Sequence, residues 1–246
     1  METHERIRYA RHLGLAELGE AGQQRLRDAT VLIVGLGGLG SPAALYLAAA
    51  GVGRLLLNDF DLVDPTNLQR QVLYRDADVG RRKVDAASDA LACVNPAVSL
   101  VRHDGRLDSD ALRTVIDGAD LVLDCTDNFG SRFTVNGACV AAGTRLVSGA
   151  AVRLGGQVAS FDLRDGIGPC YACLYREAGE SIEDCAGNGV LASLVGVIGT
   201  MLATEALRII GGIGAPASGR LLQFNAATLS WRESTFDRDP ACTVCR

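Results

Sequence analysis

Two cysteine pairs with the same spacing are the most prominent chemical feature of the sequence. Cys170 and Cys173 form one C-x-x-C pair, and Cys242 and Cys245 form another near the C-terminal end. This spacing places two thiolates within reach of one metal ion, and two such pairs complete a tetrahedral zinc site. Four sulfur ligands leave no open position for water or substrate, so the site would be structural. The alternatives are redox-active pairs or chance spacing, although no thioredoxin-like context surrounds either pair.

A glycine-rich turn follows the first apolar run. Thr30–Val34 is short and β-branched, Gly35–Gly40 reads Gly-Leu-Gly-Gly-Leu-Gly, and an alanine- and leucine-rich stretch continues to Ala50. The pattern predicts a strand, a turn and a helix, with Ser41 as N-cap and Pro42 as the first helical residue. Such a turn lets the backbone approach phosphates and directs a helix N-terminus at them. It predicts a nucleotide-binding fold, and alone it would most often suggest NAD.

Polar residues follow the next apolar run. Asp59 lies roughly 20 residues beyond the glycines, where an acid would bind a ribose hydroxyl. The segment 67–71 reads Asn-Leu-Gln-Arg-Gln and lies in a connection with helical character after Pro65. Lys83 follows a tight Gly-Arg-Arg turn. The sequence therefore concentrates hydrogen-bonding and cationic groups between the second predicted strand and the following helix.

A third polar segment, Asp124–Asn128, ends a later apolar run. Ligands of open α/β sheets bind outside the carboxyl ends of the strands, which is where Asp59 and Asp127 would lie. Arg70 and Lys83 come from the crossovers and could reach the same crevice, although solvated surface charge is the alternative for both. A ribose-binding acid, two phosphate-binding cations and a carboxylate suited to magnesium make an ATP site. The sequence has no GxxxxGK[ST] motif, so it is not a P-loop ATPase.

Alternating strand and helix patterns would position these residues. The alternation predicts a Rossmann-like, doubly wound α/β fold with a mostly parallel sheet. A change to period-two alternation predicts an antiparallel C-terminal elaboration. The expected strands are 31–35, 54–58, 98–103, 120–125 and 145–149, with antiparallel strands in 152–163 and a hairpin at 220–236; the expected helices are 42–50, 82–94, 109–117, 129–142 and 190–210.

We expect one domain over residues 1–246, with a helical N-terminal segment at 1–29 and a nucleotide-binding core at 30–150. The C-terminal part, 151–246, is expected to bind the carrier and to be held together by the zinc site. The formal net charge of −5 argues against a broad nucleic-acid surface. The apolar stretch 189–203 is shorter than the ~20 residues of a membrane span and predicts a buried helix. The polar N-terminus indicates no signal peptide, and eight cysteines without one indicate the reducing cytoplasm.

Taken together, these motifs resemble the MoeB/ThiF family of adenylyltransferases, bacterial relatives of the ubiquitin-activating enzymes. The glycine turn, the segments 67–71 and 124–128 and both cysteine pairs occur in the family's order, and the resemblance covers nearly the whole chain. It implies ATP-dependent adenylation of the C-terminal Gly-Gly carboxylate of a ubiquitin-like sulfur carrier protein, MoaD-like or ThiS-like. Those carriers serve molybdopterin and thiamin synthesis. The sulfur donor would be a separate protein, because no rhodanese-like segment follows the second cysteine pair.

The resemblance also implies residue roles. Asp59 matches the ribose-binding acid, Gly38 a phosphate-facing glycine, and Asp127 the carboxylate that holds Mg²⁺, next to Asn128. Arg11 matches an arginine supplied to the neighbouring subunit's site, as an arginine finger of a homodimer. The polar set around the triphosphate is matched by Asn67, Arg70, Gln71 and Lys83, and the structural Zn²⁺ ligands by Cys170, Cys173, Cys242 and Cys245.

The remaining cysteines divide into one ambiguous and three apolar positions. Cys185 precedes a predicted helix, which favours a thiolate, and the resemblance allows a covalent link to the carrier. The neighbouring acids Glu183 and Asp184 would raise its pKa, so an unreactive loop cysteine is the alternative. Apolar patterns predict core positions for Cys93, Cys125 and Cys139.

Two other functions remain open from the sequence. An NAD-dependent oxidoreductase is compatible with the glycine turn and Asp59, but the segment 67–71 and the cysteine pairs argue against it. A non-catalytic scaffold that binds the carrier is the other alternative, although every matched ATP-site residue is present.

Overall fold

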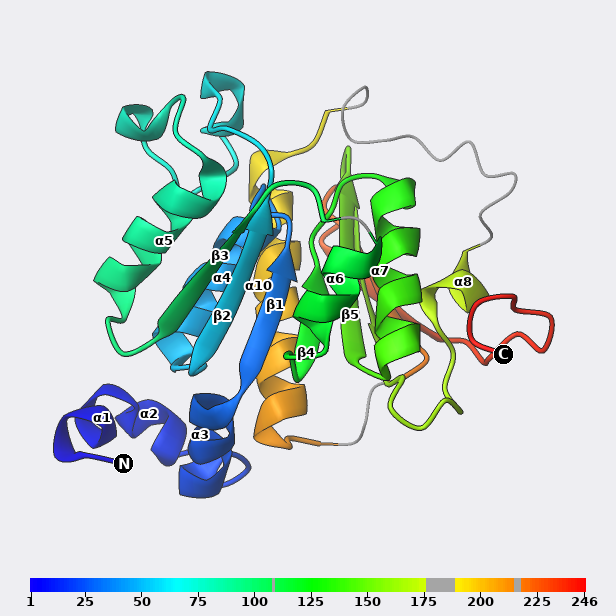
Figure 1. The fold of residues 1–246 in the computed structure, drawn as a ribbon, viewed down its shortest axis with the longest axis horizontal. Coiled ribbons are helices and arrows are strands. Elements are labelled where there is room, and N and C mark those ends of the chain that lie inside the picture. Colours follow the sequence, from blue (N-terminus) through cyan, green and yellow to red (C-terminus); the bar gives the residue numbers. More distant parts are fainter. Residues whose placement is uncertain (108, 176–188, 215–217) are drawn as a thin grey trace.

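One eight-stranded sheet organises the molecule (Figure 1). The computed structural model describes residues 1–107, 109–175, 189–214 and 218–246. The strand order is β3-β2-β1-β4-β5-β6-β7-β8; the first five strands are parallel, and β6, β7 and β8 pair antiparallel. The strands are β1 (Thr30–Val34), β2 (Arg54–Asp59), β3 (Ser99–Asp104), β4 (Leu121–Asp124), β5 (Arg145–Val152), β6 (Gly155–Phe161), β7 (Arg220–Asn225) and β8 (Ser230–Thr235).

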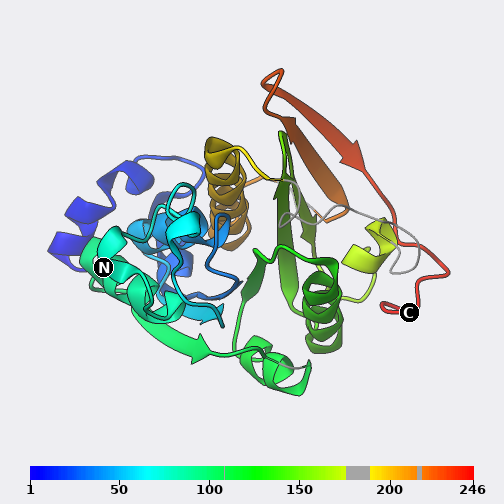
Figure 2. The ribbon, with the colours of Figure 1, turned by 90° about the horizontal axis from the view of Figure 1, so that it is seen from above.

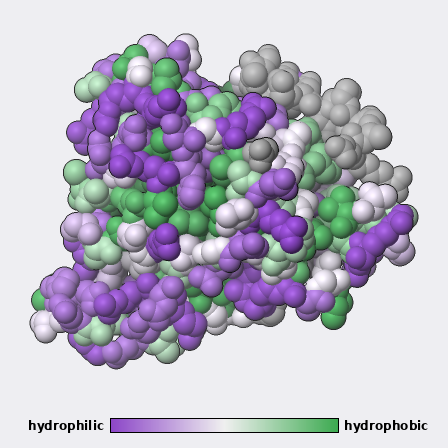
Figure 3. All heavy atoms as spheres, viewed as in Figure 1, coloured by the Kyte–Doolittle hydropathy of each residue, from purple (hydrophilic) through white to green (hydrophobic). Residues whose placement is uncertain are grey.

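Helices cover both faces of the parallel strands (Figure 2). Helices α4 and α10 pack together on one face, and α6 and α7 pack together on the other. Hydrophilic residues gather over the N-terminal helices on the face drawn in Figure 3. The helices are α1 (Thr3–Arg8), α2 (Ala10–Leu13), α3 (Gly19–Asp28), α4 (Gly40–Ala50), α5 (Lys83–Val94), α6 (Ser109–Ile116), α7 (Phe129–Ala142), α8 (Tyr171–Leu174) and α10 (Ala192–Gly211), with 3₁₀ turns η1 (Pro65–Asn67) and η2 (Asp76–Asp78).

Successive residues of β1 face two different cores. Val31 and Ile33 pack in the core with α4 and α10, whereas Leu32 and Val34 pack in the core with α6 and α7. A parallel strand buried on both faces must be apolar at every position, which explains the continuous apolar runs of the sequence. The predicted α/β fold, with a mostly parallel sheet and antiparallel C-terminal strands, is confirmed.

The predicted start of α4 is wrong. The helix begins at Gly40 with Leu39 at the N-cap, so Ser41 and Pro42 already lie inside the first turn. The Ser41 hydroxyl does not cap the helix but donates to the carbonyl oxygen of Leu36 at 3.0 Å. The serine therefore fixes the glycine turn to the helix, a role that cap propensity does not reveal.

The predicted core position of Cys93 is also wrong. Its side chain is exposed on α5, whereas Cys125 and Cys139 are buried as expected. Cys93 lies two positions after the buried Leu91, and two helical positions turn a side chain by roughly 200° to the opposite face.

By length and composition, α10 is the one helix in the described ranges that could cross a membrane. It packs instead against α3, α4, β5 and β6, and its residues Leu194, Ile198 and Leu202 are fully or almost fully buried. This agrees with the buried helix predicted at 190–210. Its apolar character therefore reflects its place in the core.

The glycine turn between β1 and α4 is a point of very close backbone approach. Gly35 has a φ of 90°, a conformation that L-residues with a side chain rarely adopt. A Cβ on Gly40 would overlap the carbonyl oxygen of Gly35, whereas a Cβ on Gly37 would meet its nearest neighbour, Gln71 Nε2, at an ordinary 3.5 Å. Only one of these two glycines is therefore required by the packing.

We predict that Gly40→Ala lowers the free energy of unfolding by roughly 1–3 kcal/mol, because the added methyl must displace backbone. The matched variant Gly37→Ala should change stability by less than about 0.5 kcal/mol. Urea unfolding of both variants, followed by circular dichroism, measures the difference. Equal stability of the two variants would contradict the proposed close approach.

Candidate active site

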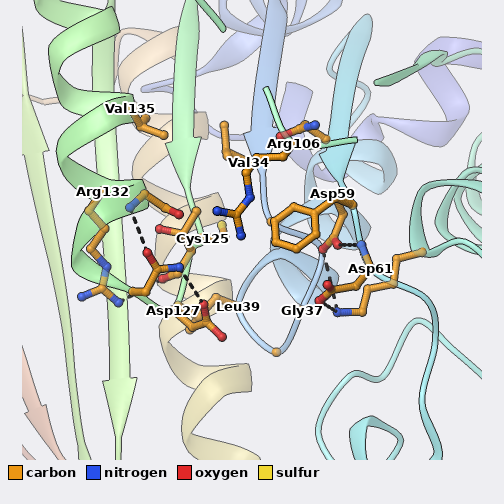
Figure 4. Close-up of a pocket in the computed structure, with 18 of the residues that line it drawn as sticks. Val34, Gly37, Leu39, Asp59, Asp61, Arg106, Cys125, Asp127, Arg132 and Val135 are labelled. Atoms are coloured by element: carbon orange, nitrogen blue, oxygen red, sulfur yellow. Dashed lines mark hydrogen bonds and ion pairs between the residues drawn. The ribbon is translucent and has the colours of Figure 1, made fainter. Parts of the chain in front are cut away.

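A cavity of about 320 Å³ opens at the carboxyl ends of β1, β2 and β4 (Figure 4). In the sheet β1 lies between β2 and β4, and the connections to these two strands run in opposite directions. The carboxyl ends of these strands are therefore the switch point of the fold, where ligands of open α/β sheets bind. The predicted site residues that line the cavity are Gly38, Asp59, Arg70, Gln71, Lys83, Asp127 and Asn128. Asp59 and Asp61 lie on one side of it, and Asp127 and Arg132 lie on the other.

Asp59 is held in place by backbone donors. The residue is 8% exposed, and its carboxylate accepts hydrogen bonds from the N–H groups of Leu36 (2.7 Å) and Asp61 (2.8 Å). Burial raises the pKa of Asp59, and the nearby Lys83 ammonium together with the two backbone donors opposes this shift. These hydrogen bonds therefore hold the Asp59 carboxylate beside the glycine turn in one orientation.

Lys83 is a buried cation and not a solvated surface charge. It is the first residue of α5 and is only 4% exposed. Its ammonium nitrogen lies 2.8 Å from Asp61 Oδ2 and 4.0 Å from Asp59 Oδ2. Burial of a cationic group is costly unless it is paired, and these two carboxylates supply the pairing.

Arg70 and Gln71 approach the cavity from the turn after η1. Arg70 is half-buried, and its guanidinium donates to the carbonyl oxygen of Thr66 at 3.0 Å. Gln71 is buried, and its side-chain oxygen has no hydrogen-bond partner within the described part of the chain. A buried polar atom without a partner is costly, so a ligand that satisfied it would be favoured.

The end of β4 presents two aspartates with different surroundings. Asp124 is fully buried and accepts hydrogen bonds from Thr126 Oγ1 (2.7 Å) and Ser148 Oγ (2.7 Å), so it organises the turn. Asp127 is exposed to the cavity, and Asn128 Nδ2 donates to it at 3.3 Å. Asn128 also caps α7 by accepting from Ser131 N at 2.9 Å. Asp127 is thus the aspartate available to a cation.

The four predicted cysteine ligands converge. Their sulfur atoms all lie within 4.8 Å of one another. The Sγ–Sγ distances are 3.5 Å for Cys173–Cys245, 3.8 Å for Cys170–Cys242 and 4.0 Å for Cys170–Cys173. A tetrahedron with Zn–S bonds of ~2.3 Å has sulfur–sulfur edges of ~3.8 Å, so the donor set fits a structural zinc ion.

Comparison with known proteins gives the family. A family model described as "ThiF family" matches residues 9–244. The chain belongs to the ThiF family. The resemblance inferred from the motifs is therefore confirmed.

Individual relatives of this ThiF-family chain cover it almost completely. Molybdopterin-synthase adenylyltransferase of Salmonella typhimurium is 47% identical over 245 residues, which are 100% of this chain and 98% of that protein. The ThiS adenylyltransferase of Escherichia coli is 42% identical over 245 residues, 100% of this chain and 97% of that protein. The crystal structure of E. coli MccB with ATP has a TM-score of 0.81 and 25% identity, and the match covers 92% of this chain and 68% of that one.

Among the described residues, two predicted site residues do not line the cavity, and a third lies outside the described ranges. Asn67 ends η1, and its carbonyl oxygen accepts from the N–H groups of Arg70 and Gln71, both at 3.0 Å. Arg11 is exposed on α2, which lies near the amino ends of the parallel strands (Figure 1), and it does not line the cavity. Cys185 lies outside the described residues.

Two arginines that the motifs did not identify also line the cavity. Arg106 follows β3, and its guanidinium carbon lies 4.7 Å from the centroid of the Phe60 ring. Arg132 is buried in the first turn of α7. Both come soon after a parallel strand, so the rule that ligands bind beyond the carboxyl ends could have found them.

Proposed function

We propose that this protein adenylates the C-terminal Gly-Gly carboxylate of a ubiquitin-like sulfur carrier, MoaD-like or ThiS-like, with release of pyrophosphate. The observation that carries the proposal is the convergence of Asp59, Lys83 and Asp127 around one cavity at the strand ends. The names of the relatives, adenylyltransferases of molybdopterin synthase and of ThiS, support the same reaction. The proposal places the enzyme in the cytoplasm.

On this proposal each of these residues has a role in binding ATP. Asp59 binds the ribose hydroxyls, and Gly38 lets the phosphates approach the start of α4. Lys83, Arg70 and Gln71 hold the phosphates. The carbonyl oxygen of Asn67 fixes the turn that carries Arg70 and Gln71, and its side chain stays in the expected polar set around the triphosphate.

The chemistry needs little proton transfer. A carboxylate oxygen of the carrier bonds to the α-phosphorus while the bond to the bridging oxygen of pyrophosphate breaks. Two anions must be brought together, so catalysis consists of positioning and charge neutralisation. Asp127 would hold Mg²⁺, which supplies charge neutralisation when bound. An NAD-dependent reaction has no support from the relatives named above.

We propose that Arg11 acts in the site of the partner subunit of a homodimer. It is exposed and lies away from the cavity of its own chain, so it cannot serve there without a large rearrangement. An arginine supplied in trans would stabilise the phosphate charge in the manner of an arginine finger. Each dimer would then contain two composite sites.

We further propose a structural zinc ion at the four cysteines. The N–H donor Asn136 Nδ2 lies 3.6 Å from Cys170 Sγ, an outer contact of the kind that stabilises zinc thiolates. The ion would tie the segment 242–245 to α8 and, through Asn136, to α7. Cys185 and the separate sulfur donor remain expectations from the family resemblance.

ATP–pyrophosphate exchange by the purified protein tests the function, with MoaD-like and ThiS-like carriers supplied separately. We expect exchange with one carrier. Asp127→Ala should reduce it by roughly 10²–10³-fold, because a charge-stabilising contact is lost. The control Asp117→Ala removes an exposed aspartate outside the cavity and should leave the rate unchanged. Normal exchange by Asp127→Ala would exclude its assigned role.

A mixed dimer tests the placement of Arg11. Co-expression of Arg11→Ala and Asp127→Ala chains with different tags gives a heterodimer with one intact composite site and one doubly damaged site. We expect about half of the wild-type exchange rate from the heterodimer and very little from either mutant homodimer. An inactive heterodimer would mean that Arg11 acts within its own chain.

Removal of one zinc ligand tests the metal site. Cys242→Ser should lose bound zinc, measured by mass spectrometry, and lower Tm by on the order of 10 °C, because metal binding contributes to folding. Cys93→Ser, which changes an exposed cysteine outside the cluster, should keep both zinc and Tm. A wild-type protein without zinc after purification in zinc-supplemented buffer would refute the site.

A further inference from the structure

A second hollow adjoins the nucleotide cavity. It has a volume of about 740 Å³ and lies along β5, β6 and β7, with Gly155, Gly156 and Phe224 among its lining residues. Asp127, Arg132 and Ala151 line both this groove and the nucleotide cavity. The two spaces therefore meet at these three residues, and a peptide that entered along the groove would reach the nucleotide there.

Arg132 is the one basic residue among the described residues that lines both spaces. Arg70, Lys83 and Arg106 line the nucleotide cavity alone, and Arg232 lines the groove alone. Lys83 is already paired with two carboxylates, and Arg106 is placed over the Phe60 ring. Among the described residues, Arg132 is therefore the single cation at the junction, the place where the groove and the nucleotide cavity meet.

The Arg132 guanidinium is buried and only partly satisfied. The residue is 5% exposed, and its terminal nitrogen donates to the carbonyl oxygen of Thr126 at 2.9 Å. The guanidinium carbon lies 5.2 Å from the centroid of the Phe129 ring. Its Nε has no hydrogen-bond partner within the described ranges. The Tyr171 hydroxyl also interacts with this guanidinium. A guanidinium has five N–H donors, so these partners leave donors for an anionic acceptor nearby.

We propose that Arg132 binds the C-terminal carboxylate of the carrier at the junction and holds it for attack on the α-phosphorus. The inference rests on the proposed function and adds a catalytic residue to it. A planar guanidinium matches the geometry of a carboxylate better than the point charge of a lysine does. Its positive charge offsets the repulsion between the carboxylate and the phosphates as the new P–O bond forms and pyrophosphate leaves.

Binding of an amidated carrier tests this contact directly. The carrier that supports pyrophosphate exchange is prepared with its natural C-terminal carboxylate and with a C-terminal carboxamide. Calorimetry then measures Kd for each in the presence of Mg²⁺ and a non-hydrolysable ATP analogue. For the wild type we expect the carboxylate to bind roughly 10–100-fold more tightly, the range for a charged hydrogen-bonded contact.

Substitution of Arg132 should remove this preference. Arg132→Gln keeps an amide donor for the Thr126 carbonyl but loses the charge, so its two Kd values should become equal while its Kd for the nucleotide analogue changes less than about twofold. Arg132→Lys, which keeps the charge without the planar fork, should give an intermediate ratio and serves if the glutamine variant does not fold. The control Arg232→Gln removes a groove cation away from the junction and should keep the wild-type ratio.

The outcomes separate the inference from the function on which it rests. Equal binding of the two carriers by the wild type, or a full carboxylate preference in Arg132→Gln or Arg132→Lys, overturns the role of Arg132. Absence of pyrophosphate exchange by the wild type with either carrier overturns the proposed function instead.

Discussion

The candidate site depends on backbone-to-backbone contact at the glycine turn. A Cβ on Gly35 would meet the backbone of Cys125 at 2.9 Å, and one on Gly199 of α10 would overlap the backbone of Leu39. These contacts hold β1, β4 and α10 against the turn at spacings that only glycine permits. The cavity therefore opens beside a place where these elements meet at main-chain distances.

Helix α7 connects the nucleotide cavity to the cysteine cluster. Asn128, Arg132 and Asn136 are spaced by four residues and so lie along one face of the helix. Asn128 caps the helix beside Asp127, and Asn136 accepts a hydrogen bond from Tyr171 N at 2.8 Å in the cysteine-bearing segment. The cysteine-bearing segment therefore contacts the helix that carries Arg132, at a place away from the cavity.

The sequence predicted the features that follow from strand ends and residue spacing. Asp59 and Asp127 end or follow parallel strands, and the cysteine pairs have metal-ligand spacing, so topology and stereochemistry were enough. Tertiary packing decided what the sequence missed. The Ser41 hydroxyl donates to the Leu36 carbonyl from inside the helix and does not cap it, and the burial of Arg132 depends on how α7 packs on the sheet.

Arg11 and Asn67 also show that a sequence pattern does not fix the direction of a side chain. Local patterns identify polar residues near a site, but they do not say which ones a single chain turns toward it. Asn67 contributes its carbonyl group and so acts on the backbone of its own turn. Arg11 is exposed on α2 and does not line the cavity of its own chain.

The charges that line the nucleotide cavity nearly cancel. Among the described residues these are Arg70, Lys83, Arg106 and Arg132 against Asp59, Asp61 and Asp127. A single chain therefore has little electrostatic preference for a nucleotide with three phosphates over one with two, since each added phosphate meets acids as well as bases. In the proposed dimer a metal ion and a second subunit would add positive charge to the cavity, and assembly would then determine which nucleotide is selected.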